Sequence, residues 1–134
     1  MGRRLLSVIL FGSRARGTAG PSSDYDCLLI VTDEPDDVVV MEVLLAAREA
    51  GSIDVHIETL SNLKANLRLG DPARLNMILE GMALYGDAGV RLRTLARKAV
   101  TKYGLTPRPD IGKGCWLARE TFPPGTPYRM YQRA

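Results

Sequence analysis

The sequence predicts one α/β (α+β) domain in which a mixed sheet of about four strands is flanked by helices. Three observations predict it: strand-like apolar segments alternate with helical ones, the helical segments carry start and stop signals, and Gly, Pro and Ser gather in the turns. The 134 residues are enough to bury a core without disulfides. We expect a folded domain over 1–104, and a Pro-rich tail over 105–134 that meanders and either packs on the body or docks a partner.

Four segments have the pattern of strands. Leu5–Phe11 is a continuous apolar run, and Asp24–Val31 is polar at its start and apolar afterwards. Ser52–Thr59 alternates, with its aliphatic side chains on one face and its polar side chains on the other. Met82–Tyr85 is expected as a short edge strand.

The helices are marked by their ends. Asp36 and Asp37 favour a helix N-terminus, Pro35 suits the first turn, and Gly51 ends the helix after Ala50. Asp71 is the expected cap of another helix, with Pro72 at its first position. The helices expected besides the one ending at Ala50 are a short one beginning at Ser13 and those over 61–69, 72–80 and 89–103.

The charge is distributed unevenly along the chain. The formal net charge is +3, yet residues 1–60 hold 5 basic and 10 acidic side chains and residues 61–134 hold 13 basic and 5 acidic. An acidic half suits metal binding, whereas a basic half suits an acidic protein or a nucleic acid. An ordinary solvated surface explains the basic half equally, so a nucleic-acid partner stays open without being favoured.

Neither a membrane nor an oxidising compartment is indicated. No apolar run approaches the roughly 20 residues that span a bilayer. Basic residues precede the apolar run Leu5–Phe11, as in a signal peptide, but no small-residue cleavage site follows it. The two cysteines, Cys27 and Cys115, are far apart and lack metal-ligand spacing. We therefore expect a cytoplasmic protein.

Three acidic residues form the candidate catalytic and metal site. Asp24 and Asp26 are two apart on a strand, so their side chains leave the same face. Asp54 begins the polar face of the next long strand, and it joins them if the two strands are neighbours. Carboxylates that converge repel each other unless cations neutralise them, and Mg²⁺ prefers such oxygen ligands. His56 shares the face of Asp54, but a lone strand histidine is more often a half-exposed polar residue, so we leave it outside the site.

A turn just upstream has the chemistry of a phosphate site. Gly12 lets the backbone approach a phosphate, and Ser13 offers a hydroxyl at a helix N-terminus. Arg14 adds positive charge, although a solvated helix face accounts for it nearly as well. A phosphate site opposite a carboxylate pair is typical of phosphoryl or nucleotidyl transfer with two metal ions.

The order and spacing of these residues resemble a known signature. Gly12-Ser13-Arg14-Ala15-Arg16-Gly17 followed by Ser23-Asp24-Tyr25-Asp26 resembles the motif of the minimal nucleotidyltransferases (MNT), within the polymerase-beta-like nucleotidyltransferase superfamily. The ten residues between Ser13 and Asp24 match that pattern, and the resemblance covers about Leu5 to Tyr85. Many relatives have a helix before the first strand, where this sequence has only a few residues, and the resemblance does not extend to the Pro-rich tail.

The resemblance implies the following roles. Asp24, Asp26 and Asp54 would bind two Mg²⁺ ions, and Gly12 and Ser13 would hold the phosphates of ATP. Such proteins are often encoded beside a HEPN-domain RNase toxin, and they act as antitoxins by transferring AMP to a toxin tyrosine. The expected partner is therefore a HEPN-family toxin, in a homo- or hetero-oligomer.

Three alternatives stay open at this point. The chain is a non-catalytic antitoxin that neutralises its toxin by binding, or its acceptor is RNA, or its acceptor is a small molecule. The last reading needs a further helical domain, as in aminoglycoside adenylyltransferases, and the chain is short for it.

Overall fold

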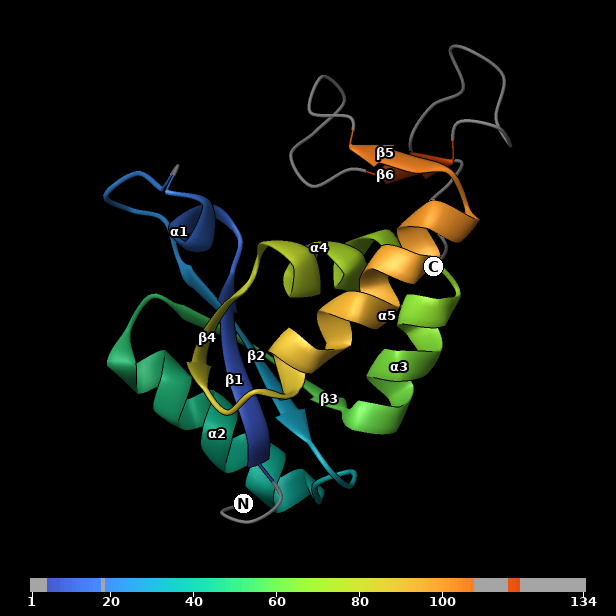
Figure 1. Cartoon of the computed structure of the whole chain (residues 1–134). Helices are drawn as coiled ribbons and strands as arrows, with labels where there is room; N and C mark the ends of the chain where they lie inside the picture. The colour runs from blue at the N-terminus through green and yellow to red at the C-terminus, as the bar shows by residue number, and fades with distance from the viewer. Residues whose placement is uncertain (1–4, 18, 108–115, 119–134) are drawn as a thin grey trace.

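The computed structural model, which describes residues 5–17, 19–107 and 116–118, contains a mixed four-stranded sheet. Its order is β3-β2-β1-β4, with β1 at Leu5–Phe11, β2 at Tyr25–Val31, β3 at Ile53–Thr59 and β4 at Met82–Tyr85. β1 is antiparallel to β2 and β4, whereas β2 and β3 are parallel (Figure 1). The predicted fold class is confirmed, and so is the edge strand at Met82–Tyr85.

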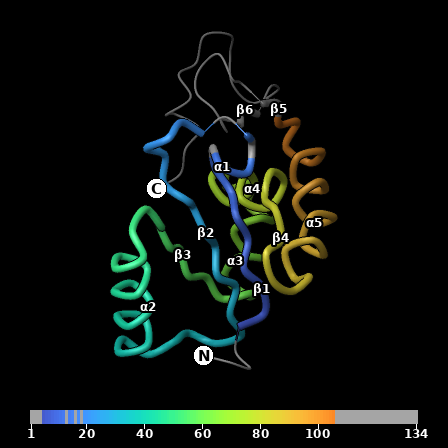
Figure 2. Tube along the Cα trace, turned by 90° about the vertical axis from the view of Figure 1, so that its left-hand side faces the viewer, coloured from blue at the N-terminus to red at the C-terminus, as the bar shows by residue number. Residues whose placement is uncertain are grey.

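The helices cover the two faces of the sheet unequally. α2 (Asp37–Ala50) lies on one face, whereas α3 (Leu60–Arg68), α4 (Pro72–Glu80) and α5 (Ala88–Lys102) lie on the other (Figure 2). The short α1 (Ser13–Arg16) connects β1 to the turn before β2. The parallel pairing of β2 and β3 requires a crossover, and α2 supplies it.

Local sequence signals set the helix ends. The side chains of Asp36, Thr59 and Asp71 each accept a hydrogen bond from a backbone N–H in the first turn of α2, α3 and α4. Gly51 ends α2 at φ 99°, a conformation that favours glycine. One detail differs from expectation: Asp36 is the cap, so Pro35 lies before the helix and not in its first turn.

The core lies on the three-helix side of the sheet. The buried apolar side chains of this core come mainly from β2, α3, α4 and α5, and they include Leu28, Ile30, Leu63, Leu67, Leu75, Ile78 and Leu92. A Cβ at Gly81 or Gly89 would meet the side chain of Ile9, so these glycines let α4 and α5 approach β1 closely. By contrast, α2 contributes no buried residue.

Part of the tail is regular. β5 (Leu105–Pro107) pairs antiparallel with β6 (Trp116–Ala118), and Leu105 is buried against the main core. The expectation of an irregular chain from Leu105 onward is therefore wrong for these strands. The rest of the predicted tail, 108–115 and 119–134, lies outside the described residues. Within the described ranges, no helix has the length and apolar character that a membrane span requires.

Candidate active site

Asp26 and Asp54 are direct neighbours across the sheet. In the parallel pair of β2 and β3, Asp26 is in register with Asp54, and Leu28 with His56. Alternation along a strand puts residues two apart on one face, so both carboxylates lie on the face that carries the buried Leu28. The sequence analysis assumed that the strands carrying Asp26 and Asp54 are neighbours, and β2 and β3 are paired directly.

A histidine completes the cluster. One ligand atom each of Asp26, Asp54 and His56 lies within 4.8 Å of the others. His56 Nε2 is 3.3 Å from Asp54 Oδ2, and the ring centroids of His56 and Phe11 are 5.4 Å apart. Sequence reasoning left His56 out, although its alternation with Asp54 on the same strand face was the signal that could have found it.

Asp24 stands beside this cluster. It is exposed, directly before β2, and it shares with Asp54 the lining of a 290 Å³ cavity that also includes Arg48 of α2. The group of side chains within 4.8 Å of one another, taken over the described residues, includes Asp26 and Asp54 but does not include Asp24. The role of Asp24 as a metal ligand stays a prediction.

The turn at Gly12 lies directly against the cluster. Gly12 ends β1 at φ 76°, and a Cβ built on it would collide with Oδ2 of Asp26. Only glycine therefore permits both this backbone conformation and this approach to the carboxylate. Ser13 begins α1 next to it, but its side chain lies outside the described residues. The Gly12 turn and the carboxylate of Asp26 therefore lie side by side.

Arg14 makes contacts within the turn. Its Nη2 and Nε donate to the carbonyl oxygen of Ser23, at 2.8 and 3.3 Å. Its guanidinium also lies 4.5 Å from the ring centroid of Tyr25. These contacts tie α1 to the start of β2 and fix the loop between Gly12 and Asp26. Nucleotide binding by Arg14 stays a prediction.

The donor set of the cluster fits a magnesium ion. Mg²⁺ takes oxygen ligands and keeps several waters, so two adjacent carboxylates beside open solvent suit it. An imidazole nitrogen is a poorer ligand for Mg²⁺ than a carboxylate oxygen. The contact of His56 with Asp54 instead places the histidine to orient that carboxylate. Next to the site, burial and then the negative charge of Asp26 raise the pKa of the Cys27 thiol.

The comparison with protein families agrees with this geometry. A family model described as the nucleotidyltransferase domain matches residues 3–81. The chain belongs to this family. The match spans β1, the Gly12 turn, both aspartates of the cluster and α4. No curated protein matches the chain.

Solved structures of toxin–antitoxin complexes include chains similar to this one. One is a toxin–antitoxin complex with AMP-PNP, at 23% identity and a TM-score of 0.49, covering 75% of this chain and 76% of that chain. Another is a complex of the tri-AMPylated HEPN toxin of Shewanella oneidensis with its MNT antitoxin, at 20% identity and a TM-score of 0.44, covering 75% and 72%.

Proposed function

We propose that this nucleotidyltransferase-domain protein is a cytoplasmic, Mg²⁺-dependent adenylyltransferase that transfers AMP from ATP to a hydroxyl group. The observation that carries the proposal is the Gly12 turn lying against Asp26, with Asp54 and His56 in the same cluster. A glycine turn for phosphates next to paired carboxylates for metal is the arrangement that nucleotidyl transfer needs.

Each residue has a defined task in this proposal. Asp26 and Asp54, joined by Asp24, hold two Mg²⁺ ions, which when bound neutralise the phosphates and activate the attacking hydroxyl. The backbone at Gly12 and Ser13 holds the triphosphate of ATP, and Arg14 adds positive charge there. His56 orients Asp54. The acceptor hydroxyl loses its proton to solvent and its oxygen forms a bond to the α-phosphorus, while the bond from that phosphorus to the bridging oxygen breaks and pyrophosphate leaves.

For the acceptor we propose a tyrosine of a HEPN-family toxin, which makes this chain an antitoxin. The support is the MNT signature from Gly12 to Asp26, together with membership in the nucleotidyltransferase domain family over 3–81. Of the similar solved structures named above, one is a toxin–antitoxin complex with AMP-PNP, and another pairs an MNT antitoxin with a tri-AMPylated HEPN toxin.

Mass spectrometry of the toxin after incubation with the chain, ATP and Mg²⁺ tests the proposal. We expect an AMP adduct with the wild-type chain and none with Asp26→Asn, which removes a charge but no core volume. Asp33→Asn is the matched control, because Asp33 is an exposed acid in the loop after β2 and outside the cluster. It should behave as wild type.

Two results would contradict this function. An adduct that persists in Asp26→Asn would exclude the cluster as the catalytic site. Full neutralisation of the toxin by Asp26→Asn, with no adduct in either protein, would favour the non-catalytic antitoxin that acts by binding.

A further inference from the structure

Helix α2 has apolar side chains on the side that faces away from the sheet. Val38, Met41 and Leu45 are 66%, 56% and 50% exposed, and their spacing of three and four residues puts them on one side of the helix. The half-buried Val39 and Val43 occupy the opposite side, toward β3. A helix that is apolar on both sides is typical of a buried helix, although α2 buries no residue here.

Acidic residues border this exposed apolar stripe of Val38, Met41 and Leu45. Glu42 and Glu49 lie along one edge, one helical repeat of seven residues apart, and Asp37 lies at the N-terminal end. All three are exposed. The exposed Arg48 continues the stripe at its C-terminal end, three residues after Leu45. A surface that covers the stripe must therefore be apolar in its middle and basic along the edge that meets Glu42 and Glu49.

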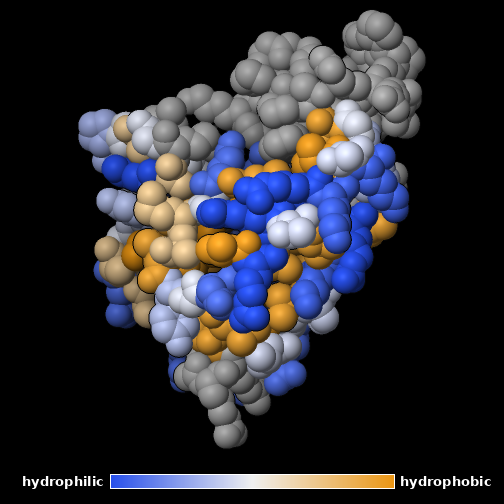
Figure 3. Space-filling view, viewed as in Figure 1, coloured by the Kyte–Doolittle hydropathy of each residue, from blue (hydrophilic) through white to orange (hydrophobic). Residues whose placement is uncertain are grey.

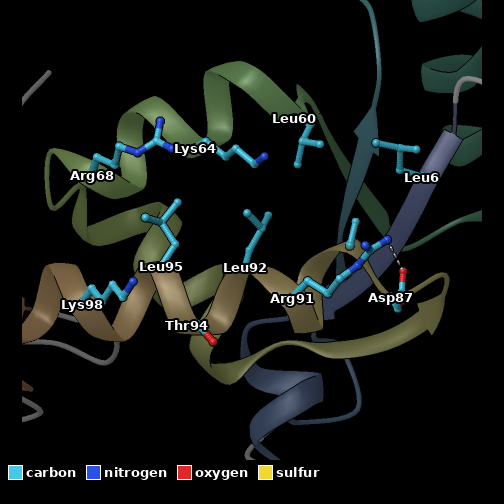
Figure 4. A pocket seen from close by; sticks show the side chains of 11 residues that line it. Leu6, Leu60, Lys64, Arg68, Asp87, Arg91, Leu92, Thr94, Leu95 and Lys98 are labelled. Carbon is cyan, nitrogen blue, oxygen red and sulfur yellow. Dashed lines mark hydrogen bonds and ion pairs between the residues drawn. The ribbon is translucent and has the colours of Figure 1, made fainter.

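Such a surface exists on the other side of the same chain. A 500 Å³ groove runs between α3 and α5, with Leu60, Leu92 and Leu95 in its lining (Figure 4). Lys64 and Arg68 of α3 and Arg91 and Lys98 of α5 stand along its two margins (Figure 4). Only Arg91 has an ion-pair partner among the described residues, Asp87 at 3.1 Å. Figure 3 shows hydrophilic residues interspersed with hydrophobic ones on the side of the molecule seen in Figure 1.

We propose that α2 of a second copy of this chain docks in the α3–α5 groove. The apolar stripe of α2 meets the leucines of the groove, and its acidic residues meet the cations of the groove. The two surfaces belong to the acidic first half and the basic second half of the chain, so the charges of two copies complement each other.

Two other occupants fit less well. The chain's own segment 108–134 carries 5 basic and 2 acidic side chains, so it does not complement a basic groove. A single-stranded nucleic acid is commonly held by stacking on aromatic side chains, whereas the lining of the groove contains none. A different arrangement, in which the α2 helices of two copies pack on each other and the groove stays empty, is also disfavoured, because it would bring the acidic residues of both copies together.

A mixing experiment tests the head-to-tail contact. The double variant Lys64→Glu/Arg68→Glu reverses two charges at the margin of the groove and leaves α2 unchanged. The double variant Glu42→Lys/Leu45→Lys disrupts the docking face of α2 and leaves the groove unchanged. All four side chains are exposed or half-exposed, and circular dichroism establishes that both variants fold. Arg97→Glu, on the opposite side of α5 from Leu95, is the matched control for a change of charge.

Sedimentation velocity over a dilution series is the measurement. The wild type and Arg97→Glu are expected to self-associate, and this association should weaken at high salt. Each double variant alone should self-associate with an affinity lower by about tenfold or more. An equimolar mixture of the two double variants should form heterodimers, because the intact α2 of one fits the intact groove of the other. A monomeric wild type would overturn the proposal, and so would variants that self-associate normally or a mixture that stays monomeric.

This test is independent of the adenylyltransferase function. None of the substituted residues lies in the cluster of Asp26, Asp54 and His56. AMP transfer that is lost in Asp26→Asn but retained in the monomeric variants would support the catalytic proposal while the oligomeric state is decided separately.

Discussion

Helices α2 and α5 are of similar length and lie on opposite faces of the sheet, yet they are held in different ways. α5 buries five residues, Ala88, Gly89, Leu92, Ala96 and Ala99, whereas α2 buries none. α2 has a side-chain cap at Asp36 and a glycine stop at Gly51. The first residue of α5 instead donates its backbone N–H to Ser7 of β1. The start of α2 is set by local sequence, and that of α5 by tertiary contacts.

The largest contrast between the two helices should come from truncating one leucine in each. Leu92→Ala removes a buried side chain of α5 and should lower the free energy of unfolding by about 2–5 kcal/mol. Leu45→Ala on α2 should change it by no more than about 0.5 kcal/mol, because Leu45 is half exposed. Urea unfolding of the dilute proteins measures both. Equal losses would contradict the difference between the two helices.

The start of α5 offers a second comparison. Ser7 is fully buried, and its Oγ accepts from the N–H of Ala88 at 2.9 Å. Ser7→Ala leaves that buried N–H without its acceptor, which should cost about 1–3 kcal/mol of unfolding free energy. Ser22→Ala in the exposed turn before β2 is the control and should be neutral. Hydrogen exchange at Ala88 should accelerate only in Ser7→Ala.

The start of α2 should be less sensitive. Asp36 Oδ1 accepts from Val39 N at 2.9 Å, and Asp36→Ala removes this cap at a cost of about 1 kcal/mol. Asp36→Asn keeps an acceptor oxygen and should recover most of the loss. If both substitutions cost the same in thermal unfolding, the helix end depends on charge and not on the cap.

The smallest expected effect concerns the thiol of Cys27. Because burial and the charge of Asp26 raise its pKa, less reactive thiolate is present at a given pH than in an unperturbed cysteine. Alkylation in a Cys115→Ser background should therefore be slow at neutral pH and rise only above the ordinary thiol pKa. Asp26→Asn should shift the rate profile slightly toward lower pH, and an unchanged profile would leave burial as the whole cause.

The sequence predicted those features that depend on neighbouring residues. Alternation in Ile53–Thr59, the Asp71–Pro72 start of α4 and the glycine at 51 gave strands and helix ends close to those observed. The position of Asp54 beside Asp26 followed from one assumption, that β2 and β3 pair. That pairing is the simplest result of a strand–helix–strand crossover.

Features that depend on distant residues were missed. β5 and β6 pair across residues 108–115, and three-residue strands carry too few positions for a visible alternation. The contact of His56 with Phe11 depends on how β1 and β3 flank β2. The hydrogen bond from the Arg14 guanidinium to the carbonyl oxygen of Ser23 likewise depends on the path of the loop, which helix and strand propensities do not describe.

The central claim is that the carboxylates of Asp26 and Asp54, beneath the Gly12 turn, hold the metal ions of a bound nucleotide. Titration calorimetry of the chain with a non-hydrolysable ATP analogue, with and without Mg²⁺, tests it without any partner. We expect Mg²⁺-dependent binding in the wild type and in Asp33→Asn, and a loss of about tenfold or more in affinity in Asp26→Asn/Asp54→Asn. Binding of equal strength in that double variant, or binding indifferent to Mg²⁺, would contradict the claim.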